Sequence, residues 1–245
     1  MSKVLVIPDC HLKIDVIETG LKLAEKVWAD NIILLGDYFD DWYAIPIDYY
    51  DMMDYLKILL RTRPNIITLL GNHELSYLGF PCSGHNKKVE SYIKKNLEND
   101  MRFYPAAEID GVLYSHAGVC TKWIRENKLL TENEIRYRLT KIAGAKFLEK
   151  GICNQPNLLH LMKVGGIRGG HSSPSCVWAD AKELIADAIP KVVQVVGHTP
   201  MKHITNVENL WFTDVFSNYN MSDEYLFVKE GIPEILHAKE ILDEE

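Results

Sequence analysis

The sequence predicts an α/β fold in which parallel strands alternate with helices, and two observations lead to this prediction. Short apolar runs rich in β-branched residues recur along the chain and stop at turns or polar clusters, as buried strands do. Two amphipathic helical patterns, over residues 15–28 and 48–62, lie between the first three runs, and such alternation implies a parallel sheet covered by helices. The apolar runs are residues 4–7, 32–35, 66–70, 112–114 and 192–196.

Two further stretches predict antiparallel strands. Asp110-Gly111 lies between short apolar segments and is a typical two-residue hairpin turn. Near the C-terminus, residues 210–214, 225–229 and 234–236 predict a β-meander, with Glu230-Gly231 as one of its turns.

The middle of the chain is helical by pattern. Thr131 followed by Glu134 forms a capping box, so a helix should begin there and end by Gly151. We expect this stretch and the loop after it to be an insertion over approximately residues 120–165. Because no repeat, low-complexity tract or linker divides the sequence, we expect one domain over residues 1–245.

The composition is that of an ordinary globular protein. Of the 245 residues, 47% are hydrophobic, which is enough for a substantial core. The net charge of −7 argues against a dedicated nucleic-acid or membrane binder, although bound cations could reverse the charge of an active site. The five cysteines contain no Cys-x-x-Cys pair, so neither a disulfide framework nor a zinc ribbon is indicated. With no signal-peptide pattern and no membrane-length apolar run, we expect a cytoplasmic protein.

Each of the five predicted strands is followed at once by a short block that carries Asp, His, Asn or Glu. In an open α/β sheet, ligands bind at the carboxyl ends of the strands, so these blocks should meet at one rim. Any single block is also a common turn sequence, whereas five of them at strand ends indicate a functional site. The blocks are Asp9-Cys10-His11, Gly36-Asp37-Tyr38-Phe39-Asp40, Gly71-Asn72-His73-Glu74, Ser115-His116-Ala117-Gly118 and Gly197-His198-Thr199.

The side chains in these blocks favour a metal site. Carboxylate, imidazole and amide groups without thiolate suit Mn, Fe, Zn or Mg better than a structural zinc site. Two metals held about 3.5–4 Å apart usually share a carboxylate. Asp37 lies in the middle of the set and is therefore the natural bridge.

In this order the blocks resemble those of the calcineurin-like metallophosphoesterase family, over residues 9–198. The Gly-Asn-His-Glu block and the ending Gly197-His198-Thr199-Pro200 favour the protein-phosphatase-like (serine/threonine phosphatase) branch. In many phosphodiesterases of the family the last block reads Gly-His-x-His, and here Pro200 replaces the second histidine. The resemblance implies an α/β four-layer sandwich, in which two facing β-sheets are flanked by helices.

The resemblance also implies the roles of individual residues. Two divalent cations are expected, Mn²⁺ first and Fe, Zn or Mg as alternatives, with a water that bridges them as the nucleophile. His73 is expected to be the general acid, oriented by Asp40, or else only to hydrogen-bond the phosphate. Asn72 is expected both to bind metal and to contact substrate. The implied ligands are Asp9, His11 and Asp37 for the first metal, and Asp37, Asn72, His116 and His198 for the second.

The sequence departs from the phosphatase branch at one substrate-contacting place. That branch continues Gly-Asp-x-x-Asp with Arg-Gly, and the arginine grips the phosphate, whereas this chain has Asp41-Trp42. Arg168, in the glycine-rich stretch 165–170, could supply the missing guanidinium. Alternatively, the substrate is a diester or nucleotide whose base stacks on Trp42, Tyr38 or Tyr43, unless these aromatic side chains only pack.

We therefore predict a dinuclear-metal phosphatase that hydrolyses phosphomonoesters, including phosphoserine or phosphothreonine of proteins. The alternative enzyme is a phosphodiesterase or nucleotide hydrolase of the same fold, with nucleic acid or a nucleotide as its substrate. A third hypothesis is a metal-less scaffold that only binds a partner protein. Such a scaffold should have lost metal ligands, whereas every ligand position of this chain carries a competent side chain. The sequence predicts no membrane partner and no particular oligomeric state.

Overall fold

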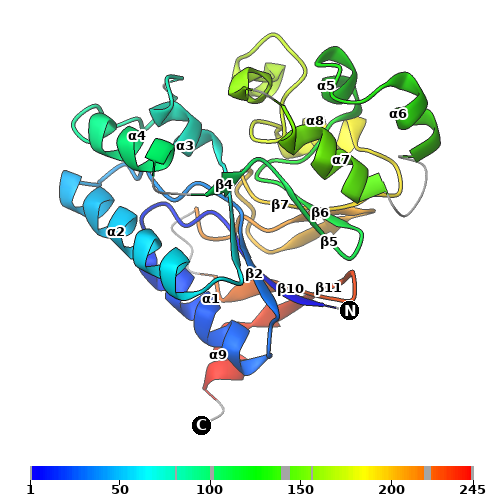
Figure 1. Cartoon of the computed structure of the whole chain (residues 1–245). Helices are drawn as coiled ribbons and strands as arrows, with labels where there is room; N and C mark the ends of the chain where they lie inside the picture. Colours follow the sequence, from blue (N-terminus) through cyan, green and yellow to red (C-terminus); the bar gives the residue numbers. More distant parts are fainter. Residues whose placement is uncertain are drawn as a thin grey trace.

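The strands of the protein form a six-stranded and a five-stranded sheet, which lie between helices (Figure 1). The computed structural model describes residues 2–80, 82–99, 102–138, 144–155, 157–217 and 222–243. The predicted α/β sandwich of two sheets flanked by helices is therefore confirmed.

The first sheet has the strand order β11-β10-β1-β2-β3-β4. Strands β1 to β4 run parallel, as the strand–helix alternation predicts, and β10 pairs with β1 in the antiparallel direction. The strands of this sheet are β1 (Lys3–Ile7), β2 (Asn31–Leu34), β3 (Ile66–Leu69), β4 (Phe103–Tyr104), β10 (Glu224–Lys229) and β11 (Ile232–His237).

The second sheet has the order β5-β6-β7-β9-β8, with a parallel centre and antiparallel edges. The hairpin predicted at Asp110-Gly111 joins β5 to β6, and both turn residues have positive φ, as a two-residue hairpin loop of this kind requires. The strands of this sheet are β5 (Ala107–Ile109), β6 (Val112–Tyr114), β7 (Val193–Val196), β8 (Thr205–Val207) and β9 (Leu210–Phe212).

The predicted C-terminal β-meander is wrong in part. Glu230-Gly231 does join β10 and β11 as a hairpin in the first sheet. However, β9 lies in the second sheet between β7 and β8, so the chain changes sheets between residues 212 and 224. Alternating hydrophobicity marks a strand but does not specify its neighbour, which is why the sequence suggested one continuous meander.

Successive residues of the second sheet point to opposite faces, and the two faces have different neighbours. Val112 and Tyr114 of β6 belong to a buried cluster shared with the first sheet, so the two sheets pack face to face. Leu113, between them, belongs to a second buried cluster with Trp123 and Leu148 of the covering helices. Both faces of the sheet are therefore dry, which is typical of parallel strands.

The helices cover the outer faces of the sheets. Helix α1 packs on β1 and α9, and α7 packs on β5 and β6. In Figure 1, α1, α2 and α9 lie together, and α5 to α8 form a separate group beside the second sheet. The helices are α1 (Ile14–Lys26), α2 (Pro46–Thr62), α3 (Asn72–Tyr77), α4 (Glu90–Asn99), α5 (Thr121–Glu126), α6 (Glu132–Arg138), α7 (Gly144–Cys153), α8 (Ala181–Asp187) and α9 (Ala238–Leu242), with short 3-10 turns at Leu158–Met162 and Gly166–Arg168.

The stretch between β6 and β7 contains α5 to α8. The capping box predicted there is present, because the amide of Glu134 donates to Oγ1 of Thr131 and the amide of Thr131 donates to the Glu134 carboxylate. The helix that this box opens is α6, described over Glu132–Arg138, and a further helix, α7, extends to Cys153. Residues 139–143 lie outside the described part of the chain.

All five cysteines are free thiols, in keeping with their scattered positions in the sequence. Among the helices of the described residues, none combines the length and the apolar character that crossing a membrane requires.

Leu56 and Ile58 of α2 provide a test of this packing. Leu56 is completely buried in the first cluster, whereas Ile58 is 60% exposed. Leu56→Ala should lower the free energy of unfolding by about 2–5 kcal/mol, because it leaves a cavity. Ile58→Ala should change it by less than about 0.5 kcal/mol. Urea unfolding of both variants, followed by circular dichroism, measures the difference, and equal losses would contradict the observed orientation of α2.

Candidate metal centre

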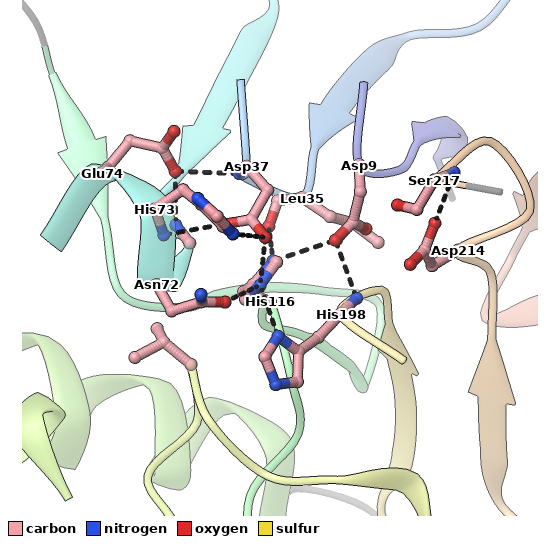
Figure 2. Close-up of polar contacts among 12 residues, drawn as sticks. Asp9, Leu35, Asp37, Asn72, His73, Glu74, His116, His198, Asp214 and Ser217 are labelled. Atoms are coloured by element: carbon pink, nitrogen blue, oxygen red, sulfur yellow. Dashed lines mark hydrogen bonds and ion pairs between the residues drawn. The ribbon is translucent and has the colours of Figure 1, made fainter. Parts of the chain in front are cut away.

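The five predicted blocks converge on one site (Figure 2). The loops after β1, β2, β3, β6 and β7 bring their polar side chains together at the carboxyl ends of these strands. Above them lies a cavity of about 950 Å³. Asp9 and His116 are fully buried beneath it, and the residues that line it include His11, Asp37, Asp40, Asn72, His73, Arg168 and His198.

Two groups of potential metal ligands share the carboxylate of Asp37. One group is His11, Asp37 and His73, the other is Asp37, His116 and His198, and within each group the ligand atoms lie within 4.8 Å of one another. Asn72 adjoins the second group, since its Oδ1 lies 3.0 Å from Nε2 of His116. Asp37 is therefore the residue that both groups have in common.

Asp9 belongs to neither of these groups in the described structure. Its Oδ1 accepts the amide hydrogen of His198 at 2.9 Å and lies 3.7 Å from Nδ1 of His116. The carboxylate thus contacts the second group, although the family resemblance implies that it binds the first metal together with His11.

Backbone contacts orient the imidazole rings. Nδ1 of His11 donates to the carbonyl of Asp40 at 2.9 Å, and Nδ1 of His116 donates to the carbonyl of Leu35 at 3.0 Å. In both rings Nε2 is left to face Asp37, at 3.9 Å from its Oδ2 for His11 and 3.3 Å for His116. Hydrogen bonds of this kind fix the tautomer and the orientation of metal-ligating histidines.

The glycines of the blocks are required by close approach. A Cβ atom on Gly71 would overlap the carboxylate of Asp37, and one on Gly197 would overlap that of Asp9. Several residues of the site also have positive φ, which is uncommon for residues with a side chain: His11 at 42°, Asp37 at 53°, Asp40 at 69° and His198 at 66°. Such conformations are typical of functional sites, where the surrounding structure holds them in place.

Glu74 holds two of the loops together, although no role was predicted for it. Its buried carboxylate accepts the amide hydrogens of Asp37 at 2.8 Å, Tyr38 at 2.9 Å and Gly71 at 2.9 Å. Burial and the nearby Asp37 raise the pKa of Glu74 to about 7. The fourth position of the Gly-Asn-His-Glu block is therefore explained by loop geometry.

The structure brings His73 and Asp40 into hydrogen-bonding contact. Nδ1 of His73 donates to Oδ2 of Asp40 at 2.8 Å, and the hydroxyl of Tyr77 donates to the other carboxylate oxygen. Burial lowers the pKa of His73, but the charge of Asp37 and the bond to Asp40 outweigh burial and raise that pKa well above its ordinary value. Tyr77 is not predicted from the sequence, because a buried tyrosine inside a helix is usually only a core residue.

Two of the central groups, Asp37 and His198, have the charges that metal binding requires. Burial would raise the pKa of Asp37, but His116 and His73 hold it well below its usual range. Burial lowers the pKa of His198 well below its ordinary value, and the neighbouring His116 lowers it further. At neutral pH, Asp37 is therefore ionised and His198 is neutral, which are the forms in which these groups bind metal ions. His116 differs, because burial lowers its pKa but Asp37 and Asp9 outweigh burial and raise it to about 9, so His116 must release a proton to bind a cation.

Unpartnered atoms also indicate that the residues fit a cation. Oδ2 of Asp9 and Nε2 of His198 are buried without a hydrogen-bond partner among the described residues. Burial and the carboxylate of Asp214 raise the pKa of Asp9 well above its usual range. Buried polar atoms are nearly always satisfied in folded proteins. A cation would satisfy Oδ2 of Asp9 and offset the repulsion between the carboxylates.

The predicted substrate-binding residue Arg168 lines the same cavity. Its Nε lies 3.3 Å from Oδ2 of Asp180, and its terminal nitrogen lies 3.5 Å from the carbonyl of His198. Asp41 and Trp42, which stand where the phosphatase branch has Arg-Gly, also border the cavity. A guanidinium therefore lines the cavity, but it comes from the turn Gly166–Arg168 and not from the position after Asp40.

The three aromatic residues considered for base stacking have different positions. Tyr38 is buried in the core, and its hydroxyl donates to the carbonyl of Leu69 at 3.0 Å. The hypothesis that a substrate stacks on Tyr38 is therefore wrong, because this ring is not accessible. Tyr43 is 80% exposed and borders a smaller neighbouring cavity of about 350 Å³. Trp42 is 78% exposed and borders the main cavity.

Known proteins share this architecture. A family model described as calcineurin-like phosphoesterase matches residues 2–204. The comparison with curated proteins returned no match. Among solved structures, a mutant of a cold-active protein tyrosine phosphatase has a TM-score of 0.58 at 20% identity, with 96% of this chain and 80% of that chain covered.

Two further solved structures are similar over the same shares, 96% of this chain and 80% of the other. The cold-active protein-tyrosine phosphatase of a psychrophile, Shewanella sp., has a TM-score of 0.56 at 20% identity. A protein serine/threonine phosphatase from Saccharomyces cerevisiae, with similarity to human phosphatase PP5, has a TM-score of 0.51 at 15% identity. At these identities the likeness shows the fold alone. Because the family model covers most of its length, the chain belongs to the calcineurin-like phosphoesterases, a family of metal-dependent phosphoester hydrolases.

Proposed function

We propose that this protein is a two-metal phosphatase that hydrolyses phosphate monoesters, including phosphoserine or phosphothreonine in proteins. The observation that carries the proposal is the carboxylate of Asp37, which is common to both groups of potential ligands. Two catalytic metal ions are usually held about 3.5–4 Å apart around such a shared group. A scaffold that only binds a partner would have no need for this set of buried, charged side chains.

The proposed ligands are those implied by the family resemblance. Mn²⁺ is our first choice of metal, and Fe, Zn or Mg would also suit a set of oxygen and nitrogen ligands. When bound, the cations supply Lewis acidity, which lowers the pKa of water and offsets the charge of the phosphoryl group. Asp9, His11 and Asp37 would hold one cation, and Asp37, Asn72, His116 and His198 would hold the other.

His73 is proposed to protonate the leaving oxygen. Its Nδ1 is engaged by Asp40, which leaves Nε2 as the acidic position on the cavity side, 4.0 Å from Asp37. A raised pKa keeps the imidazole protonated near neutral pH, so that it can act as a general acid. Asp40 would be a positioning residue, and Tyr77 would hold Asp40 in turn.

Arg168 and Asn72 are proposed to bind the phosphate. A guanidinium can hold two phosphate oxygens at once, and Arg168 is the arginine among the residues that line the cavity. Asn72 lines the same cavity, and its Nδ2 donates to Sγ of Cys82 at 4.0 Å, while its Oδ1 lies 3.0 Å from Nε2 of His116.

The decisive assay compares para-nitrophenyl phosphate with its bis-ester in the presence of Mn²⁺. We expect the monoester to be preferred and the activity to disappear with a chelator and return with added Mn²⁺, because the reaction depends on the cations. Asp37→Asn, which removes the shared carboxylate, should be inactive under all these conditions. Preference for the bis-ester would favour a phosphodiesterase, in which Asp41 and Trp42 at the rim disfavour a dianionic group. Activity that is insensitive to chelator would overturn the two-metal proposal.

His73→Ala tests the proposed general acid. Turnover should fall about 10²- to 10⁴-fold, which is the usual contribution of a positioned acid, whereas the metal content should stay near that of the wild type. His171→Ala, which changes an exposed histidine, is the matched control and should be fully active. Loss of both metals from His73→Ala would mean that His73 is a ligand, as its place in the first group allows.

Arg168→Ala tests the phosphate contact. KM for the monoester should rise about 10- to 100-fold, because a hydrogen bond to a charged group contributes more than a neutral one. Arg168→Lys should recover only part of this loss, because an ammonium group lacks the planar fork of the guanidinium. An unchanged KM for both variants would show that Arg168 serves only to pair with Asp180.

A further inference from the structure

Asp214 has no part in the reaction proposed above, yet it lies in the same site. It follows β9, as the five blocks follow their strands, and it is 1% exposed and borders the cavity. Its Oδ1 accepts the amide hydrogen of Ser217 at 3.1 Å, and its carbonyl accepts the amide hydrogen of Met201 at 2.7 Å. These bonds fix Asp214 beside the loop that carries His198.

The carboxylate of Asp214 neighbours that of Asp9. Figure 2 shows the two side chains next to each other at the ends of β1 and β9, and they interact electrostatically. Oδ2 of Asp9, which is completely buried, has no hydrogen-bond partner among the described residues. Neither carboxylate pairs with a lysine or arginine in the described part of the chain, and the ammonium of Lys13 donates to the carbonyl of Phe216.

Two neighbouring buried carboxylates repel each other, even though His116 lies 3.7 Å from Oδ1 of Asp9, and a bound cation relieves this repulsion. The loop after β7 offers no second histidine, because Pro200 stands where Gly-His-x-His would place one. Met201, the next residue, is the one that bonds to the backbone of Asp214. Asp214 therefore lies beside the segment in which that histidine is missing, and both Pro200 and Asp214 line the cavity.

We propose that Asp214 supplies an additional carboxylate to the cation held by Asp9 and His11. The negative charge, rather than the hydrogen bond to Ser217, is the part of the side chain that matters. This inference rests on the two-metal centre proposed above, and it assigns to that centre a residue from a sixth strand end.

Asp214→Asn separates the charge from the fold, because an asparagine oxygen can still accept the amide hydrogen of Ser217. The measurement is isothermal titration of Mn²⁺ into chelator-treated full-length protein. The wild type should bind two Mn²⁺, and in Asp214→Asn one of the two should bind about 10- to 100-fold more weakly, the usual cost of changing such a group around a metal. Asp41→Asn is the matched control, since it also removes one charge from the cavity wall, and it should bind both ions normally.

Thermal melting gives a second readout that does not depend on activity. Without metal, Asp214→Asn should melt at a higher temperature than the wild type, because the repulsion with Asp9 is relieved, and it should gain less from added Mn²⁺. Equal Mn²⁺ affinity in Asp214→Asn and the wild type, or an equal loss in Asp41→Asn, would overturn the role of Asp214 and leave the two-metal centre intact. A wild-type protein that binds no Mn²⁺ would overturn both.

Discussion

The carboxylate of Asp37 is buried at the carboxyl ends of the strands, and the arrangement of the site depends on how that negative charge is accommodated. Histidines approach it from three sides, and the amide of His73 donates to its Oδ1 at 3.0 Å. The backbone that carries it is held by Glu74, whose carboxylate also holds the loop of Gly71. Because an unpaired buried charge is very unfavourable, these partners are a condition for placing Asp37 there at all.

The layered fold supplies the stability that offsets the unfavourable burial of so many charged side chains. Parallel strands covered on both faces bring their carboxyl ends to one rim, while two dry clusters of apolar side chains lie beneath it. The loops at the rim can then adopt unfavourable backbone conformations, as at Asp37 and His198, because the strands before them are fixed. The buried strands thus stabilise the fold, and the loops at their carboxyl ends carry the polar side chains of the site.

The strands, the helices between them and the set of polar side chains in the site were largely predictable from the sequence. The reason is that the strand and helix patterns are clear and that polar blocks follow the predicted strands directly. The strands at residues 4–7, 32–35 and 66–70 are predicted by their length and their β-branched composition. The blocks after them carry carboxylate, imidazole and amide side chains, which are common metal ligands. The sequence does not reveal which side chains contact each other across loops, or which strands are neighbours in a sheet. Tyr77 and Glu74 act through hydrogen bonds across loops, and β9 shows the same alternation whichever sheet it joins. Asp214 also follows a strand, β9, as the residues of the five blocks do. However, β9 is short, and no second residue able to bind metal stands close to Asp214 in the sequence, so no block was recognisable there.

Gly71 and Gly197 leave no room for a side chain beside the carboxylates of Asp37 and Asp9. A substitution at either glycine would displace the carboxylate of an aspartate that is itself not substituted. In a natural variant, therefore, an inventory of ligand residues would still count every one as present, while the geometry that makes them ligands would be lost. The positions at which this site tolerates least variation include two that contribute no functional group to it.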